Sequence, residues 1–441
     1  MAELEPLYSA DEMRAAEAGH DVDAMMQRAG AAVAEALMRR FPDARRITLH
    51  AGGGANGGDG QIAAEILQAH GRELVDERPD AVIDALLGTG LKGAPREETS
   101  RLIEQINAAG VPVLAVDIPS GVNASTGAVA GAAVNADLTV AMHGAKVGLA
   151  VAPGRFHAGE VAVADIGLEP AETEHRLVTA EILAEVPRRS ARDNKYTAGH
   201  VLVVGGSRGM TGAPALAARA ALRADAGYVT IAAPAECLPV LETLVLESVK
   251  RPLEDVFAAA AKAKALAVGP GLGRQPEAKE LVRRLLAEVE LPMVVDADAL
   301  FELEPGEWPA PRVLTPHEGE LARLLGCGSK EIAAQRLASV QEAAEKFSAV
   351  VVLKGEDSLV AAPGRGVLVC ALGLPSLSTA GTGDVLTGVT AAFLAKGMEP
   401  QRAAAAACAA QQLAAREASQ RYGLVASDVV EALPQALALA W

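Results

Sequence analysis

Short apolar runs alternate with amphipathic segments along the first part of the chain. Residues Ile47 to Ala51 predict a strand that runs into the glycine-rich string GGGANGGDG, and helical spacing of apolar residues resumes from Gln61 to His70. Strands separated by helical segments are typical of a parallel sheet covered by helices. Further elements of this alternation are predicted at 81–90 (AVIDALLGTG), 97–109, 111–121 (VPVLAVDIPSG) and near 137–142.

Two helices are predicted before the first strand. Ser9 and Glu12 form a capping-box pattern ahead of an Ala-rich stretch, and residues 21–40 place Ala and Met at helical spacing. The span between Asp59 and Asp84 is short for the strand and helix expected there. We therefore expect a trimmed edge of the sheet in this region.

The alternation stops around residues 169–192, where charged sequence contains Pro170 and Pro187, and then starts again. The second series opens with HVLVVGGSRGMTGAP at 200–214. It continues through YVTIAAP, ALAVGPGLG, LPMVVDADAL, RVLTPHEGE and AVVVLKGEDSLV, and closes with LSTAGTGDVLTG and Ala-rich helices. We predict an α/β protein with two doubly wound domains, at residues 1–170 and 190–441, joined by a linker over 171–189.

Composition narrows the classes of partner. The 441 residues carry a formal net charge of −16 and the basic residues are scattered, which argues against a nucleic-acid partner. There is no uninterrupted run of eighteen apolar residues and no secretory pattern near the start, so we expect a cytoplasmic protein that does not enter a membrane. The four cysteines are dispersed without a CxxC or Cys/His pattern, and are expected to be buried free thiols.

Polar residues follow three of the predicted strands in the first half. They are Asn56 with Asp59, then Asp84, and then Asp117 with Ser120. The carboxyl ends of parallel strands meet at one edge of a sheet, where ligands bind, and consecutive glycines let a phosphate approach the backbone. Each motif alone is also explained by a tight turn or a helix cap, so the argument rests on the set.

Together with LKGAP at 91–95 and AKVGL at 145–149, these loops resemble the YjeF N-terminal family of NAD(P)H-hydrate epimerases over residues 5–168. The resemblance implies a Rossmann-like domain with potassium at Asn56, Asp84 and Ser120, and with Asp117 as the acid/base residue and Lys92 as its partner. Ala55 stands where the family usually has Asn. The implied dinucleotide contacts are Ala55, Asn56, Gly57, Gly58, Asp59, Gly88, Thr89, Gly90, Leu91, Lys92, Gly93, Ala94 and Asp117.

The string LSTAGTGDVLTG at 377–388 carries the sharpest chemical signal of the second half. Gly381 and Gly383 bracket a turn that opens a helix, so backbone N–H groups of residues 382–384 can converge on a phosphoryl oxygen. Asp384 would lie beside the reacting hydroxyl as a base. A bare helix cap is the alternative reading of this motif.

The GTGD motif resembles the ribokinase-like superfamily, and the strings DNKYTAGHVLVVGGSRGMTGAP, VGPGLG, LTPHEGELARLLG and VVLKGEDSLV resemble its ADP/ATP-dependent NAD(P)H-hydrate dehydratases. Glu318 replaces the usual Pro, and an isolated His such as His317 is also a common helix cap. The implied contacts to the hydrated nicotinamide are Gly271, His317, Glu318, Gly319, Glu320, Leu321, Ala322, Arg323 and Asp384. Those to the nucleotide are Lys354, Gly355, Glu356, Asp357, Ser358, Leu374, Thr379, Ala380, Gly381, Thr382 and Gly383.

These resemblances imply a bifunctional enzyme. It would interconvert (R)- and (S)-NAD(P)HX, the hydrates of NADH and NADPH, and dehydrate the (S) form while converting ADP, or ATP in its place, to AMP and phosphate. We expect K⁺, Mg²⁺ with the nucleotide, the small molecules NADHX, NADPHX and ADP as partners, and a homo-oligomer. One alternative is a small-molecule kinase with a non-catalytic dinucleotide-binding domain, and another is a regulatory dinucleotide-binding protein.

Overall fold

The computed structural model describes residues 4–420 and 422–439, which divide into two units. The smaller unit is formed mainly by Pro6–Arg176, and the larger mainly by residues 177–332 and 338–439. The expected domain limits at residues 1 and 441 lie outside the described residues. The stretch 171–189, expected as a linker, contains strand β8 (Arg176–Leu177) and the 3-10 helix η2 (Ala180–Glu185), and it contributes Ile182 and Leu183 to the core of the larger unit.

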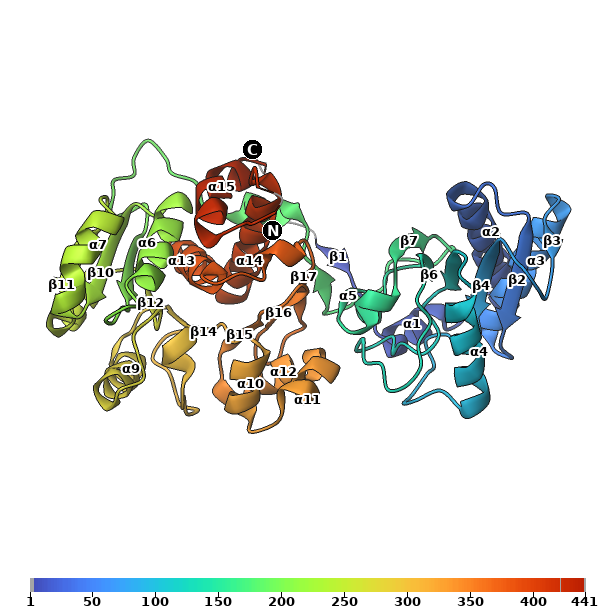
Figure 1. Ribbon diagram of the computed structural model, residues 1–441, viewed down its shortest axis with the longest axis horizontal. Coiled ribbons are helices and arrows are strands. Elements are labelled where there is room, and N and C mark those ends of the chain that lie inside the picture. Colours follow the sequence, from blue (N-terminus) through green and yellow to red (C-terminus); the bar gives the residue numbers. More distant parts are fainter. Residues whose placement is uncertain (1–3, 421, 440–441) are drawn as a thin grey trace. The chain divides into compact units, whose positions relative to one another are not determined.

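The smaller unit contains a six-stranded sheet of order β3-β2-β4-β5-β6-β7, with every neighbouring pair parallel (Figure 1). The α/β alternation predicted from the sequence is therefore confirmed for this half. Its strands are β2 (Arg46–Ala51), β3 (Glu73–Leu74), β4 (Ala81–Ala85), β5 (Val113–Val116), β6 (Leu138–Met142) and β7 (Glu160–Ala164). Its helices are α1 (Ala10–Glu17), α2 (Val22–Arg40), α3 (Ala55–Ala69), α4 (Glu97–Ala108) and α5 (Val147–Ala150).

Both faces of this sheet are buried. Successive side chains of a strand point to opposite faces, so neighbouring residues join different apolar clusters. Ile83 of β4 belongs to the cluster that includes residues of α2 and α3, whereas its neighbour Val82 packs with Ile103 and Ile106 of α4. The continuous apolar runs of the sequence thus reflect strands covered on both sides. The predicted capping box at the start of α1 is also present, since Ser9 and Glu12 exchange hydrogen bonds with each other's backbone N–H groups.

The glycine-rich string after β2 forms the first turns of α3, so the prediction that this helix begins at Gln61 is wrong. The helix begins at Ala55 and takes in Gly57, Gly58 and Gly60. A Cβ atom at residue 57 would lie 1.9 Å from the Gly52 carbonyl oxygen, and one at residue 60 would lie 2.6 Å from the Ala85 Cβ atom. These glycines let the helix approach the ends of β2 and β4 closely, and that packing overrides the low helix propensity of glycine.

The trimmed edge of this sheet, predicted from the short span after Asp59, is confirmed. The edge strand β3 has only two residues, which pair with the start of β2. No helix lies between β3 and β4 within the described residues. The shortening affects the outer edge, and the three strand ends that carry the polar residues remain adjacent in the order β2-β4-β5.

The larger unit contains an 11-stranded sheet of order β1-β8-β17-β16-β15-β14-β13-β12-β9-β10-β11. In this order, every neighbouring pair from β15 to β11 is parallel. Strand β16 is antiparallel to β15, and β17 is antiparallel to β16. Its remaining strands are β1 (Glu5–Pro6), β9 (His200–Val204), β10 (Tyr228–Ala233), β11 (Val249–Pro252), β12 (Ala265–Val268), β13 (Met293–Val295), β14 (Arg312–Leu314), β15 (Val350–Leu353), β16 (Ser358–Ala361) and β17 (Leu368–Cys370).

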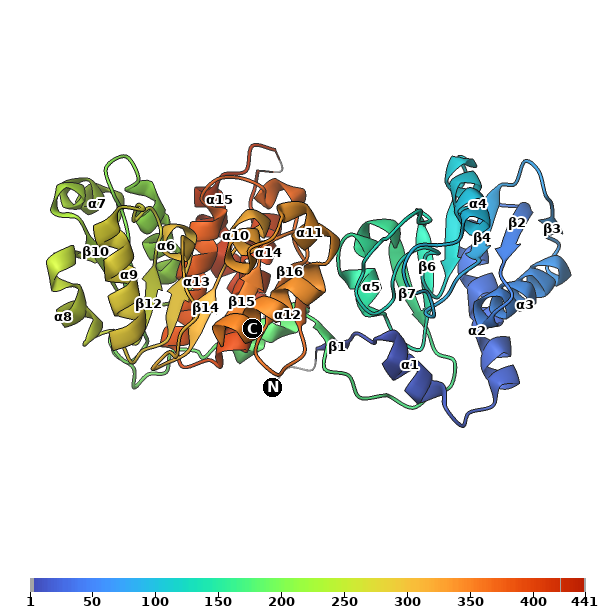
Figure 2. The same ribbon diagram turned by 90° about the horizontal axis from the view of Figure 1, so that it is seen from below.

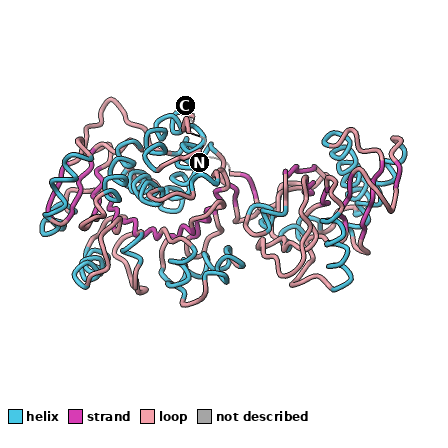
Figure 3. The backbone as a smooth tube through the Cα atoms, in the orientation of Figure 1, coloured by secondary structure: helices cyan, strands magenta, loops and turns pink. Residues whose placement is uncertain are grey.

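Helices cover both faces of this sheet, as Figures 1, 2 and 3 show. One layer contains α6, α13, α14 and α15, whose buried alanines form a large part of the core. Small residues let these helices pack closely: a Cβ atom at Gly388 would lie 2.0 Å from the Ala217 carbonyl oxygen. The helices are α6 (Gly212–Arg223), α7 (Leu238–Leu244), α8 (Val256–Ala260), α9 (Pro276–Glu288), α10 (Glu318–Leu325), α11 (Ser329–Ala334), α12 (Arg336–Phe347), α13 (Thr382–Ala395), α14 (Pro400–Glu417) and α15 (Ala426–Ala438).

Among the residues that the structure describes, no helix combines the length and the apolar character needed to cross a bilayer. All four cysteines are free thiols, as predicted, and Cys237, Cys370 and Cys408 are buried. The prediction of burial is wrong for Cys327, which is only partly buried.

Candidate active sites

A cavity of 720 Å³ opens in the smaller unit where β2, β4 and β5 end. Most residues expected to contact the dinucleotide line it, whereas Gly57, Gly58 and Gly93 do not. Gly57 and Gly58 serve helix packing instead, because a Cβ atom at either would overlap the Gly52 oxygen or the Met26 side chain. The expected residues that line the cavity are Ala55, Asn56, Asp59, Gly88, Thr89, Gly90, Leu91, Lys92, Ala94 and Asp117.

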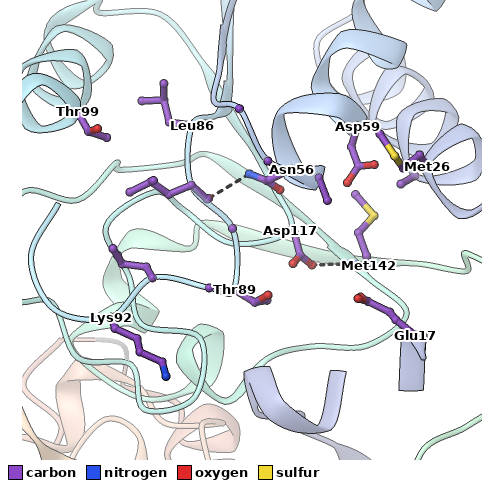
Figure 4. Close-up of a pocket in the computed structure, with 18 of the residues that line it drawn as sticks. Glu17, Met26, Asn56, Asp59, Leu86, Thr89, Lys92, Thr99, Asp117 and Met142 are labelled. Atoms are coloured by element: carbon purple, nitrogen blue, oxygen red, sulfur yellow. Dashed lines mark hydrogen bonds between the residues drawn. The ribbon is translucent and has the colours of Figure 1, made fainter. Parts of the chain in front are cut away.

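Asp117 is held by a buried ion pair. It follows β5 with φ at +65°, a left-handed conformation that Asp tolerates better than most residues. Its Oδ1 atom accepts hydrogen bonds from the Met142 N–H, at 3.0 Å, and from the Lys146 ammonium group. The Lys146 side chain is 1% exposed, and its Nζ atom also donates to the Met142 carbonyl oxygen at 2.7 Å. The cation that fixes Asp117 is therefore Lys146, and Lys92 extends from another part of the cavity wall (Figure 4).

Two more carboxyl groups turn into the same cavity. Asp59 projects from α3 and Glu17 from the end of α1 (Figure 4). Burial, followed by the nearby charges of Asp117 and Glu17, raises the pKa of Asp59 to about 7. Burial and the charge of Asp117 also raise the pKa of Glu17. A cavity with several carboxyl groups and one buried ammonium group can hold and exchange protons near neutral pH.

The three residues expected to hold a cation lie close together: Asn56 is in the first turn of α3, Asp84 is near the end of β4, and Ser120 is in the loop after β5. Both Asn56 and Ser120 are hydrogen-bonded to the backbone of Leu87. The Ser120 hydroxyl donates to the Asp84 Oδ1 atom at 2.6 Å and accepts from the Leu87 N–H at 2.9 Å. Asn56 donates through Nδ2 to the Leu87 carbonyl oxygen at 3.0 Å. Asp84 is fully buried, which raises its pKa to about 6.

The oxygen atoms of this cluster suit a hard monovalent cation. The Asn56 Oδ1 atom is buried and accepts no hydrogen bond, which is a costly state for an amide oxygen. A cation bound there would satisfy this atom and offset the charge of the buried Asp84 carboxylate. The donor set therefore fits a bound K⁺ ion.

A second cavity of 610 Å³ lies in the larger unit, at the ends of β13, β14 and β15 and at the start of α13. Its walls bring together most of the residues expected to bind the nucleotide: Lys354, Gly355, Glu356, Ser358, Leu374, Thr379, Gly381, Thr382 and Gly383. Asp357 and Ala380 are not part of the wall, and Asp357 is buried.

The start of α13 forms one wall of this cavity, as the GTGD motif predicts. Gly381 precedes the helix with φ at +90°, a conformation that favours glycine. The Thr382 hydroxyl fixes the turn by donating to the carbonyl oxygens of Leu377, at 3.0 Å, and Thr379, at 2.8 Å. N–H groups in the first turn of a helix have no acceptor within the helix and can bind an anion. Asp384 lies in this turn, and burial followed by the charge of Asp296 raises its pKa to about 7.

Asp296 and Lys354 form a buried ion pair on the floor of the second cavity. The Lys354 Nζ atom lies 2.8 Å from the Asp296 Oδ1 atom, and the Thr387 hydroxyl donates to Oδ2 at 2.9 Å. The charge of Lys354 and these hydrogen bonds keep the pKa of Asp296 below its usual value despite complete burial. A Cβ atom at Gly383 would lie 3.4 Å from the Lys354 Nζ atom, so this cation also borders the GTGD turn.

His317 lines the second cavity and also caps α10. Its Nδ1 atom accepts from the Gly319 N–H at 3.0 Å, and Glu320 returns the bond by accepting from the His317 N–H at 2.9 Å. The cap reading is therefore confirmed for His317. Of the other residues expected to contact the nicotinamide, Asp384 lines the cavity, whereas Gly271, Glu318, Gly319, Glu320, Leu321, Ala322 and Arg323 are not among the lining residues.

Comparison with known proteins agrees with this arrangement. A family model described as NAD(P)H-hydrate dehydratase matches residues 201–435, and one described as YjeF-related protein N-terminus matches 22–77 and 68–148. The bifunctional NAD(P)H-hydrate repair enzyme of Moorella thermoacetica is 37% identical, over 94% of this chain and 92% of that protein. The Escherichia coli enzyme of that name is 34% identical, over 93% and 88%. The chain belongs to the bifunctional NAD(P)H-hydrate repair enzyme family.

Solved structures identify the fold of the larger unit of this repair-enzyme family member. An ADP/ATP-dependent NAD(P)H-hydrate dehydratase from Bacillus subtilis, co-crystallised with ATP and Mg²⁺, is 28% identical with a TM-score of 0.56, covering 60% of this chain and 98% of that chain. A ribokinase-like superfamily protein from Enterococcus faecalis has a TM-score of 0.55 at 24% identity and covers 62% and 98%. The ribokinase-like prediction for the second half is confirmed.

The sequence reasoning missed charged residues at both sites, among them Glu17, Lys146 and Asp296. Asp296 directly follows β13 in the string VVDADAL, so the rule that selected Asp84 and Asp117 at strand ends could have found it. Lys146 lies in the AKVGL string that supports the resemblance, but nothing in that string reveals that its ammonium group is buried against Asp117.

Proposed function

We propose that this chain restores hydrated NADH and NADPH, with an epimerase site in the smaller unit and a nucleotide-dependent dehydratase site in the larger. The observation that carries this proposal is the pairing of two cavities in one family member. One is lined by Asp117 and Lys92, and the other by the GTGD turn with Asp384. Each cavity lies at the carboxyl edge of a parallel sheet, where such folds bind ligands.

In the epimerase site, Asp117 is the residue that exchanges protons with the hydrated nicotinamide ring. Its position against Lys146 and the Met142 N–H supports this role, because both donors bind the same carboxylate oxygen, Oδ1, of a residue that lines the cavity. The loops at 55–59 and 88–94 would hold the dinucleotide. Lys92, on the cavity wall, supplies a positive charge suited to its phosphates.

Asn56, Asp84 and Ser120 would hold K⁺ beside this cavity. The unpaired Asn56 oxygen and the buried Asp84 carboxylate support that assignment. When bound, the cation supplies positive charge and holds the start of α3, the end of β4 and the loop after β5 in one arrangement. Asp117 follows the same β5 strand that leads to Ser120, so ordering this loop also orders the catalytic carboxylate.

In the dehydratase site, Asp384 would remove the proton from the ring hydroxyl as that oxygen attacks the terminal phosphoryl group of ADP, or of ATP in its place. Phosphate then leaves with the former hydroxyl oxygen as the ring nitrogen forms a carbon–nitrogen double bond. The adjacent ring carbon loses a proton to the departing phosphate, and the dihydronicotinamide is restored. The first-turn N–H groups of α13 would stabilise the charge that develops on the phosphoryl oxygens, with Mg²⁺ accompanying the nucleotide. A base whose pKa is about 7 is suited to this step at neutral pH.

The decisive experiment supplies the purified full chain with a mixture of the two NADH hydrate epimers, ADP, Mg²⁺ and K⁺. Complete conversion of both epimers to NADH, with stoichiometric AMP and phosphate, supports both activities. Conversion of the (S) form alone would show that the chain has the dehydratase activity but not the epimerase activity. Consumption of nucleotide without recovery of NADH would favour a small-molecule kinase and contradict the proposal. The cytoplasmic location and the homo-oligomer stay predictions.

A further inference from the structure

The carboxyl groups of Asp59 and Asp117 share one cavity but have different surroundings. Asp117 is bound to an ammonium group and a backbone N–H. Asp59 is 8% exposed, and among the described residues no group donates a hydrogen bond to its side chain. The two groups come from different walls, because Asp59 belongs to α3 and Asp117 follows β5 (Figure 4). Two carboxyl groups in unlike environments are the usual arrangement of an acid with a base.

The chemistry of the proposed epimerisation calls for two such groups. The ring carbon that carries the hydroxyl is bonded to the ring nitrogen, so the carbon–oxygen bond can break as the nitrogen lone pair forms a carbon–nitrogen double bond. The departing hydroxyl must gain a proton to leave as water. Water that then adds to the opposite face must lose one. The proton is given on one face and taken on the other, which a single fixed carboxylate does not achieve.

We propose that Asp59 is the second proton-transferring residue of the epimerase site and acts on the face of the ring opposite Asp117. In one direction, Asp59 gives its proton to the leaving hydroxyl and Asp117 takes a proton from the incoming water. In the other direction the two residues exchange roles. The reaction neither consumes nor produces water overall, and one proton moves from Asp59 to Asp117. This inference rests on the proposed epimerase function.

The charges around Asp59 determine which group holds that proton before the reaction. Asp117 and Glu17 oppose the ionisation of Asp59, and Lys146 favours it more weakly; together with burial they raise the pKa of Asp59 to about 7. The Lys146 ammonium group forms an ion pair with the Asp117 carboxylate and therefore stabilises the negative charge of that carboxylate. The resting proton accordingly lies on Asp59. Glu17 is more exposed than Asp59 and therefore less suited to retain a proton.

The test compares Asp59→Asn with Glu65→Gln, a matched control on the exposed face of the same helix. Epimer interconversion is followed by chromatography in the full chain, and dehydration of the pure (S) form is measured in parallel. We expect Asp59→Asn to lower the epimerase kcat about a hundredfold or more with little change in KM. Glu65→Gln should match the wild type, and dehydration should be unchanged in both variants.

The pH profile separates proton transfer from a structural role. The wild-type epimerase rate should fall as pH rises above about 7, because Asp59 must hold its proton. Asp59→Asn should lose this alkaline limb, and Asp59→Glu should restore part of the rate. A kcat of Asp59→Asn near that of the wild type, or a wild-type rate that is level from pH 6 to 9, would overturn the inference. A wild type that dehydrates the (S) form without interconverting the epimers overturns the epimerase function itself.

Discussion

The raised pKa of Asp59 has a consequence for stability that can be measured without substrate. Its value of about 7 in the folded chain compares with an ordinary value of 3.8. Each pKa unit corresponds to about 1.4 kcal/mol, so a shift of roughly three units costs the folded state roughly 4 kcal/mol once Asp59 is ionised. Asp59→Asn removes the ionisable group and keeps the shape of the side chain. The variant should therefore be more stable than the wild type at pH 8.

The sign follows from proton binding. Between about pH 4 and pH 7 the folded state retains a proton on Asp59 that the unfolded state has lost, so the stability of the wild type declines as pH rises through this window. Below about pH 4 both states are protonated and Asp59→Asn should be close to neutral. The gain should grow to an upper bound of roughly 4 kcal/mol at pH 8.

The assay must report on the smaller unit, since a chain of two units need not unfold in one step. Both tryptophans, at 308 and 441, lie outside residues 6–176, so their fluorescence is not a suitable probe. Differential scanning calorimetry at pH 4.5 and pH 8 measures the transitions. Amide exchange of peptides from β4 and β5 identifies the transition that belongs to the smaller unit. Glu65→Gln serves again as the control. An equal effect of Asp59→Asn at both pH values would refute the reasoning.

Four other changes give separate tests. Asp384→Asn should slow dehydration about a hundredfold to ten-thousandfold while ADP still binds by calorimetry, and the wild-type rate should fall below about pH 7, because the base must be ionised; near-normal turnover would leave Asp384 as a cap. Asp117→Asn should stop epimerisation yet spare dehydration of the (S) form, and loss of both activities in a folded variant would contradict separate sites. Lithium in place of potassium at equal ionic strength should depress epimerisation, as should Asp84→Asn, whereas indifference to the ion argues against the cation site. Lys354→Met should destabilise the larger unit by about 3–5 kcal/mol at neutral pH, because it leaves the buried Asp296 carboxylate without its partner; an unchanged denaturation midpoint would show that this pair is dispensable.

The sequence predicted the elements whose hydrophobic periodicity is strong. It missed the start of α3, where tertiary packing overrides the low helix propensity of glycine. Every residue of β4 is buried, as in a strand covered on both faces of its sheet. In α4, the buried residues Ile103 and Ile106 follow helical spacing. The glycines at the start of α3 locally favour a loop. They are helical because α3 packs so closely against the ends of β2 and β4 that a Cβ atom would not fit. Such contacts join residues distant in sequence and leave no local signal.

The same distinction applies to the sites. Asp84, Asp117 and Asp384 could be selected because each lies at the end of a strand, directly after one or in the first turn of a helix, positions that a sequence pattern reveals. Lys146 could not be selected in this way, because a lysine is ordinarily exposed. Its burial depends on the Asp117 carboxylate, which accepts a hydrogen bond from the ammonium group.

Each cavity is lined by residues of one unit only: residues 17–166 for the first and residues 296–412 for the second. Under the proposed function, the energy of the nucleotide is therefore spent entirely in the larger unit, and the epimerase can do no more than bring its two substrates to their intrinsic ratio. The (R) form is drawn into repair by mass action, as irreversible removal of the (S) form keeps that ratio displaced. A slow epimerase would then delay the recovery of the cofactor pool without limiting how much of it is recovered.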